Sequence, residues 1–273
     1  MSVPIFRYYP YVPGPYLPDG LRLLHISDDP AETARAPVGD SLLGDAVLSL
    51  AALKDLLRDC KPKTGKAREK VVHRMAPHPS SRAKVSVDGL LTAMQVFSAL
   101  GEIRLAKAIL VEETPSNLAD LHTCWPITEP ASFFTFASGV LGWALPASVD
   151  IALGERETGR DRLVIGIIGD GSFQYSLQSI WTAAQQHLPI LFIVLRNGEY
   201  SILKSFAEHE ETPGVPGLDL PGLDIVSLTR GYGCDAAHLD DLGAIKKAVA
   251  EAWTKSKPTV LEIPIPPQVP PPI

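Results

Sequence analysis

The sequence predicts an α/β protein in which a parallel sheet is flanked by helices. Between residues 86 and 265, short apolar runs of strand length alternate with stretches of helical periodicity. Two of these runs, Leu163–Ile168 and Ile190–Leu195, are continuously apolar and are joined by a helix-like stretch. Strands of this kind, linked through helices, are typical of parallel sheets that are buried on both faces.

The first sixty residues predict smaller elements. Leu21–Ile26 is a short apolar run that we expect to be a strand. A helix should begin at Asp28-Asp29-Pro30, because proline is favoured in the first helical turn. Apolar residues recur with helical spacing over Ala46–Leu57 and predict a second helix there.

Composition divides the chain further. Residues 61–85 are basic, contain Pro, Ser and Gly, and have few apolar side chains, so we expect a linker between domains. Residues 266–273 are rich in proline, and we expect them to form a tail outside the domain. The elements expected between these segments are, in chain order, helix Asp88–Leu100 with Asp88 as its N-cap, strand Lys107–Glu112, a helix from Ser116, strand Phe133–Phe136, helix Leu141–Leu153, the two apolar strands, a loop over 208–223, helix Asp224–Gly231, strand Gly233–Ala237, helix Asp240–Trp253 and strand Thr259–Ile263.

Bulk properties exclude several classes of protein. The chain is 45% hydrophobic and 21% charged, which is typical of a globular protein, and its net charge of −6 gives no reason to expect a nucleic-acid partner. No apolar run is long enough to span a membrane, so no membrane partner is expected. The N-terminus lacks the pattern of a signal peptide and the three cysteines are far apart, so we expect free thiols and a cytoplasmic protein.

Polar residues follow both apolar strands. Gly169-Asp170-Gly171 comes after the first, and Arg196-Asn197-Gly198 after the second. The carboxyl ends of neighbouring parallel strands are where open α/β sheets bind ligands. One carboxylate and one amide oxygen suit Mg²⁺, which usually adds phosphate and water ligands. The glycines allow a phosphate to approach the backbone, and the following helix presents its positive end.

This arrangement resembles the diphosphate-binding half of the thiamine diphosphate enzymes. Their signature is Gly-Asp-Gly followed, one strand later, by Asn-Asn, where this chain has Arg196-Asn197. The resemblance implies that Asp170, the Asn197 side chain and the Glu199 carbonyl hold Mg²⁺. A nucleotide-dependent oxidoreductase is a weaker alternative, since the third glycine of the dinucleotide motif is replaced by Gln174.

Longer segments are similar to the benzoylformate decarboxylase branch of this family, whose members decarboxylate aromatic 2-oxo acids with thiamine diphosphate and Mg²⁺. These segments are FRYYPYVPGPYL, SDDPAETARAPVGD, ETPSN, SGVLGWALPAS, GDGSFQYSLQSIWTAAQ and PGLDLPGLD. The resemblance implies that residues 1–60 are the C-terminal part of the family's middle domain and residues 86–265 its diphosphate-binding domain. The pyrimidine-binding domain, with the glutamate that activates the cofactor, has no counterpart here.

The resemblance also implies roles for single residues. Ser116, Gly169, Gly171 and Ser172 would bind the cofactor's diphosphate. Gly139 would offer its carbonyl to the cofactor's 4′-amino group, Leu141 would hold the cofactor bent, and Phe206 would line the substrate pocket. Two positions depart from the branch: Tyr9 stands where it has a catalytic histidine, and Pro115 where it often has a hydroxyl. No catalytic residue is therefore assigned.

Several functions stay open at this stage. The chain could be a truncated decarboxylase or one subunit of a split enzyme, acting on a small 2-oxo acid with a pyrimidine-domain subunit in a homo- or hetero-oligomer. It could be a catalytically silent remnant that binds the cofactor. It could also belong with other thiamine diphosphate enzymes, such as acetolactate synthase or oxalyl-CoA decarboxylase. If the chain is a decarboxylase, we expect weak or no activity from it alone, without a partner that supplies the pyrimidine domain.

Overall fold

The computed structural model describes residues 14–60, 89–103, 107–137, 139–160 and 162–268. The chain divides into two compact units, residues 1–76 (unit 1) and residues 77–272 (unit 2). The expected linker over 61–85 lies outside the described residues, as does Tyr9. None of the helices in the described ranges is long and apolar enough to cross a membrane.

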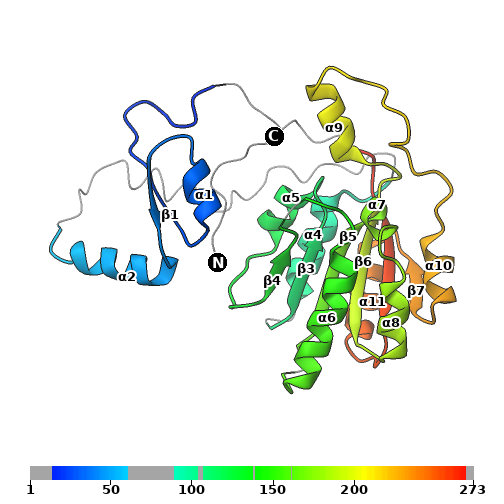
Figure 1. The fold of residues 1–273 in the computed structure, drawn as a ribbon. Helices are drawn as coiled ribbons and strands as arrows, with labels where there is room; N and C mark the ends of the chain where they lie inside the picture. Colours follow the sequence, from blue (N-terminus) through cyan, green and yellow to red (C-terminus); the bar gives the residue numbers. More distant parts are fainter. Residues whose placement is uncertain (1–13, 61–88, 104–106, 138, 161, 269–273) are drawn as a thin grey trace. The chain divides into compact units, whose positions relative to one another are not determined.

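Unit 1 contains a small parallel sheet and two helices (Figure 1). Strand β1 (Leu24–Ser27) pairs in parallel with β2 (Asp40–Leu43), which the sequence did not predict. Helix α1 (Pro30–Arg35) begins where expected, and α2 (Ala46–Leu56) covers the predicted range.

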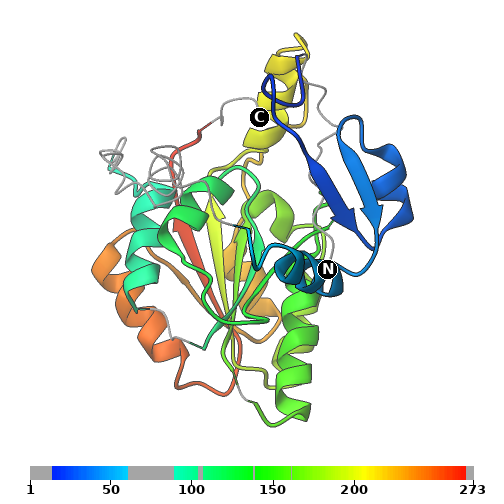
Figure 2. The ribbon, with the colours of Figure 1, turned by 90° about the vertical axis from the view of Figure 1, so that its left-hand side faces the viewer.

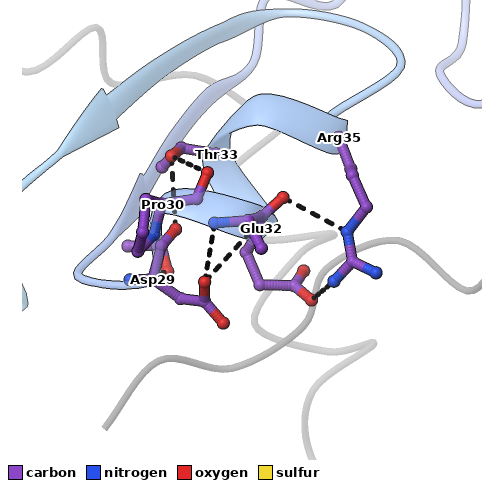
Figure 3. Close-up of polar contacts among 7 residues, drawn as sticks. Asp29, Pro30, Glu32, Thr33 and Arg35 are labelled. Carbon is purple, nitrogen blue, oxygen red and sulfur yellow. Dashed lines mark hydrogen bonds and ion pairs between the residues drawn. The ribbon is translucent and has the colours of Figure 1, made fainter.

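A short polar network fixes the start of α1 (Figure 3). The Asp29 carboxylate accepts the backbone N–H of Ala31 at 2.7 Å, and Pro30 occupies the first turn, where its missing N–H costs nothing. Glu32 pairs with Arg35 one turn later. Asp29 and Pro30 therefore start helix α1 in the way that the sequence predicted.

Unit 2 is built on a parallel sheet of six strands in the order β4-β3-β5-β6-β8-β7 (Figure 1). Every neighbouring pair is parallel, which confirms the predicted fold class. The strands are β3 (Ile109–Glu113), β4 (Phe133–Thr135), β5 (Val164–Gly169), β6 (Ile190–Arg196), β7 (Asp235–His238) and β8 (Thr259–Pro264). The chain leaves β3 in one direction to form β4 and resumes on the other side with β5, so the order reverses between β3 and β5.

Helices cover both faces of this sheet (Figure 2). One face packs against α4 (Ala93–Ile103), α5 (Leu118–Cys124) and α11 (Leu242–Ala252). The other packs against α6 (Ala144–Glu157), α7 (Asp170–Phe173), α8 (Ser179–Gln185) and α10 (Ile225–Gly231). Along β6, Leu191 and Ile193 face the first layer while Phe192 and Val194 face the second. This two-sided burial explains why the central strands are continuously apolar.

Several helix boundaries differ from those predicted. The first helix of unit 2 begins at Ala93, because Thr92 and Gln95 form a capping box in which each side chain accepts the other residue's backbone N–H. The helix expected from Leu141 begins at Ala144. The single helix expected after β5 is two short helices, α7 and α8. Helix α9 (Ser201–His209) was not predicted.

Candidate functional site

A pocket lies at the carboxyl ends of β3, β5 and β6, where the strand order reverses. Open α/β sheets bind ligands at this kind of position. The lining residues come from four segments: Thr114–Asn117 after β3, Leu141 before α6, Gly169–Ser172 at the end of β5 and beyond, and Leu195, Asn197 and Glu199–Ile202 at the end of β6 and beyond. The two polar turns singled out in the sequence therefore meet in one pocket.

The Asp170 carboxylate is the buried anion of this pocket, with 2% of the residue exposed. One of its oxygens accepts the backbone N–H of Gly171 at 2.9 Å, and the other accepts that of Gly198 at 2.8 Å. Burial raises the pKa of this carboxyl, against the opposing effect of the two backbone hydrogen bonds and of the nearby Arg196 charge. A bound cation would favour its ionised form.

Asn197 lies in the turn after β6 and lines the same pocket as Asp170. Its Oδ1 accepts the backbone N–H of Glu199 at 3.2 Å, and its Nδ2 donates to Ser201 Oγ at 2.8 Å. Gly198 completes the turn with φ +74°, a conformation that favours glycine. The amide is thus held on both sides, and its oxygen keeps a second lone pair.

A loop segment around Asp219 pairs with the same turn. Glu199 forms an isolated antiparallel bridge with Asp219, flanked by hydrogen bonds from Tyr200 N to Leu218 O and from Leu220 N to Gly198 O, both 2.8 Å. In such a pairing the bridged residue directs its own N–H and C=O away from the partner segment. The Glu199 carbonyl is therefore not used in this pairing. It stays available to bind a metal, as its predicted role requires.

Tyr200 closes the pocket over Gly171. A Cβ atom at position 171 would lie 2.3 Å from the Tyr200 ring, so any side chain there would displace it. Burial, together with Tyr175, raises the pKa of Tyr200 to about 12. Sequence reasoning missed Tyr200 as a pocket residue, because an aromatic residue after a turn is equally typical of a core.

Leu141 reaches the pocket from a loop that Glu113 holds in place. Glu113 is fully buried, and its carboxylate accepts the backbone N–H groups of Gly142 at 2.5 Å and Ala144 at 2.6 Å. Ser176 Oγ donates to the Gly142 carbonyl at 2.7 Å. Gly142 itself has φ +97°, which ends the loop before α6 can start and explains why this helix begins later than predicted.

The structure brings most of the predicted site residues together. Those that line the pocket are Ser116, Leu141, Gly169, Asp170, Gly171, Ser172, Asn197 and Glu199, with Pro115 beside Ser116. Gly139 and Phe206 are not among the lining residues: Gly139 is exposed with φ +74°, and Phe206 is half-buried on α9. The roles assigned to these residues stay predictions.

Comparison with known proteins identifies the family. The description "Thiamine pyrophosphate enzyme, C-terminal TPP binding domain" matches residues 116–263, which include all of the pocket lining except Thr114 and Pro115. The chain belongs to the thiamine pyrophosphate enzymes. Thiamine pyrophosphate is another name for thiamine diphosphate, so the family predicted from the sequence is confirmed.

Similar proteins of this family include benzoylformate decarboxylases. The one from Pseudomonas aeruginosa is 38% identical over 97% of this chain and 47% of its own length. The crystal structure of benzoylformate decarboxylase from Polynucleobacter necessarius has a TM-score of 0.86 and 41% identity, covering 99% of this chain and 49% of that one. An acetolactate synthase large subunit from Parasynechococcus marenigrum is 25% identical over 89% of this chain and 39% of its own length.

A thiamine diphosphate-dependent 4-hydroxybenzoylformate decarboxylase from Rhodococcus jostii also shares the fold. Its TM-score is 0.83 at 34% identity, with 98% of this chain and 48% of that one covered. The chain thus spans about half the length of the relatives that it matches.

Proposed function

We propose that this chain supplies the diphosphate- and metal-binding half of a thiamine diphosphate-dependent decarboxylase that acts on aromatic 2-oxo acids. The observation that carries the proposal is the buried Asp170 carboxylate, which faces the pocket beside the oxygen-bearing Asn197 side chain at the reversal of strand order. The similarity to benzoylformate decarboxylases over almost the whole chain supports the choice of substrate class.

The donor set of this pocket fits Mg²⁺. Asp170, the Asn197 amide oxygen and the Glu199 carbonyl would supply hard oxygen ligands, and together they carry a single negative charge from Asp170. Among the described residues there is no group of three or more His, Cys, Asp or Glu side chains that could hold a metal. A site with so few protein charges suits a cation that is completed by the phosphates of its ligand.

The same pocket offers groups for the diphosphate and the rest of the cofactor. Ser116 and Ser172 would donate hydroxyl hydrogen bonds, and Gly171 lines the pocket beside them. Leu141 would provide the apolar support for the bent cofactor. When bound, thiamine diphosphate supplies the electron sink that a 2-oxo acid needs to lose CO₂.

The proposal assigns part of the enzyme to sequence outside these 273 residues. Residues 1–60 would belong to a middle domain and 86–265 to the diphosphate-binding domain, while the pyrimidine-binding domain and its glutamate would come either from more of the same polypeptide or from a separate subunit, in a homo- or hetero-oligomer. Phe206 and Gly139 would act only in that complete assembly. We place the assembly in the cytoplasm.

Calorimetric titration of thiamine diphosphate, with and without Mg²⁺, tests the proposal. We expect binding that requires Mg²⁺ and that Asp170→Ala abolishes. Asp150→Ala, which removes an exposed carboxylate on α6, is the matched control and should bind like the parent chain. A folded chain that binds no cofactor under either condition would refute the proposal.

A second test separates decarboxylation from a silent remnant. The chain should acquire activity on benzoylformate when mixed with a pyrimidine-domain polypeptide, and Mg²⁺-dependent binding without activity in that mixture would favour the remnant. Pyruvate, an aliphatic 2-oxo acid, is the comparison substrate, because the chain is also similar to an acetolactate synthase large subunit. Faster turnover of pyruvate than of benzoylformate would favour an acetolactate synthase-type function instead.

A further inference from the structure

We propose that Ser201, Glu199 and Lys204 are positioning residues that determine which end of the Asn197 amide faces the pocket. The inference rests on the proposed function, because it assigns the amide oxygen to a cation. An asparagine amide has an oxygen and a nitrogen of nearly equal size, and only the oxygen can bind Mg²⁺. The Glu199 backbone N–H, which donates to Asn197 Oδ1 at 3.2 Å, favours this orientation, and the side chains around Nδ2 decide whether it is kept.

The serine hydroxyl alone cannot make this choice. Ser201 Oγ lies 2.8 Å from Asn197 Nδ2, but a hydroxyl both donates and accepts, so it would bind either end of the amide. The Glu199 carboxylate removes the ambiguity, since it accepts the single Ser201 proton on Oε1. Towards Asn197 the hydroxyl is then left with lone pairs alone, and it requires the NH₂ group.

Lys204 completes the ordered chain of hydrogen bonds. Its ammonium has only donors, and it binds Glu199 Oε2 as well as Asp219 Oδ1, the latter at 2.6 Å. The Glu199 carboxylate therefore accepts from two sides. Lys204 donates to it directly, and Asn197 donates to Ser201, which in turn donates to the same carboxylate. The amide nitrogen is drawn to this carboxylate-centred network, and the oxygen faces the other way.

Burial makes the inner part of the network hard to replace by water. Ser201 is 1% exposed and the Glu199 side chain 10%, whereas the Asp219 side chain is 79% exposed. Water can compensate for the loss of Asp219 but not for the loss of Ser201. The orientation of the amide should accordingly depend on Ser201 and Glu199.

Two variants and a control test the assignment through Mg²⁺-dependent binding of thiamine diphosphate. Ser201→Ala removes the acceptor for Asn197, and we expect roughly tenfold weaker Mg²⁺ affinity, at the lower end for residues that orient a metal ligand. Ser205→Ala makes the same change one turn later on α9, at a buried hydroxyl for which no hydrogen-bond partner is found in the described structure, and it should leave the affinity unchanged.

Glu199→Gln should reverse the network while keeping the hydroxyl. Lys204 would take the new amide oxygen, the amide nitrogen would donate to Ser201, and the Ser201 proton would turn to Asn197. The affinity should then fall below that of Ser201→Ala. The double variant should return to the affinity of Ser201→Ala, because it has no Ser201 hydroxyl that could donate to Asn197. If Glu199 acted only through its negative charge, its loss would instead add to the effect of Ser201→Ala.

A cofactor-free readout keeps this inference separate from the proposed function. The Asn197 side-chain amide, followed by nitrogen-15 NMR without ligand, should give a hydrogen-bonded signal that Ser201→Ala shifts and Ser205→Ala does not. Additive effects of the two variants on Mg²⁺ affinity, or an amide signal insensitive to Ser201, would overturn the positioning role. A Ser201-dependent amide in a chain that binds no Mg²⁺ would support the positioning and refute the proposed function.

Discussion

The two units of this chain bury their apolar residues very differently. In unit 2, two hydrophobic clusters cover both faces of the sheet, and Phe97, Phe173 and Phe192 are fully buried. In the described part of unit 1, the only buried residues are the polar His25 and Ser27. A parallel sheet is normally covered on both faces, and a pair of strands alone is marginally stable. Unit 2 therefore has a core of its own, whereas unit 1 depends on further cover.

The largest expected effect contrasts one residue from each unit. Phe192→Ala removes a fully buried ring from the central strand β6 and should cost about 3–5 kcal/mol of stability. Leu50→Ala, at a residue that is 58% exposed on α2, should cost less than about 0.5 kcal/mol. Urea unfolding followed by circular dichroism, which reports both units, measures the two losses, and tryptophan fluorescence isolates that of unit 2, since all four tryptophans lie there. Similar shifts for both variants would contradict the comparison.

Cysteine reactivity probes the same contrast without mutation. Burial raises the pKa of the Cys234 thiol to about 12, and the Asp235 charge adds to this, while Cys60 in unit 1 is exposed. Because the folded pKa lies above the unfolded one, the neutral thiol favours the fold below about pH 9, and this contribution is lost as pH rises through 12.

The corresponding measurement is alkylation by iodoacetamide at pH 8, read by mass spectrometry. Cys60 should react at once. Cys234 should react much more slowly than in the unfolded chain, since only the thiolate is a nucleophile and burial keeps this thiol neutral and out of reach. Labelling of Cys234 at the unfolded rate in the native protein would show that the core of unit 2 opens readily.

The sequence predicted unit 2 and its pocket better than it predicted unit 1. Continuously apolar strands and glycine turns leave strong local signals, so Asp170 and Asn197 could be placed at one edge of the sheet. Strand β2 is short and exposed, and it left no such signal. Helix α9 has Tyr200 as its N-cap residue and no side-chain cap, so it lacks the local start signal that α1 has. The Ser201 hydroxyl contacts Asn197 and Glu199 instead, and periodicity cannot reveal such contacts.

The buried Glu113 carboxylate, next to the pocket, should contribute measurably to the stability of unit 2. Glu113→Gln places an NH₂ group against one of two backbone donors, Gly142 N or Ala144 N, and should cost about 2 kcal/mol. Glu112→Gln is the matched control, since its NH₂ group can donate to the Thr135 hydroxyl instead. Thermal unfolding should show a clearly larger loss for Glu113→Gln. Equal losses would mean that the Leu141 loop is held by other contacts.

Helix caps offer a finer comparison of the two units. Asp29 caps α1 in unit 1, and Asp241 caps α11 in unit 2 by accepting Ala244 N at 2.8 Å. Replacement of either by alanine should cost about 1 kcal/mol in its own helix. Asp241→Ala should lower the tryptophan-detected transition accordingly, whereas Asp29→Ala should leave it unchanged if unit 1 unfolds separately. A shift with both variants would show that the units unfold as one.

The smallest effect on stability is expected on the surface of α2. This helix is apolar on every side, and Val47, Leu48, Leu50 and Leu56 are each more than half exposed. A helix that is hydrophobic all round belongs in a core, so we expect the isolated chain to associate with itself through this surface.

Replacing two of these leucines tests that expectation. Leu48→Lys with Leu56→Lys should change unfolding of unit 2 by less than about 0.5 kcal/mol but shift sedimentation towards the monomer. Leu228→Lys alters an exposed leucine on α10 of unit 2 and should leave the association unchanged. If both changes act alike, or if the parent chain is already monomeric, α2 is not the associating surface. A clear difference would locate in unit 1 the surface that the rest of an assembly has to cover.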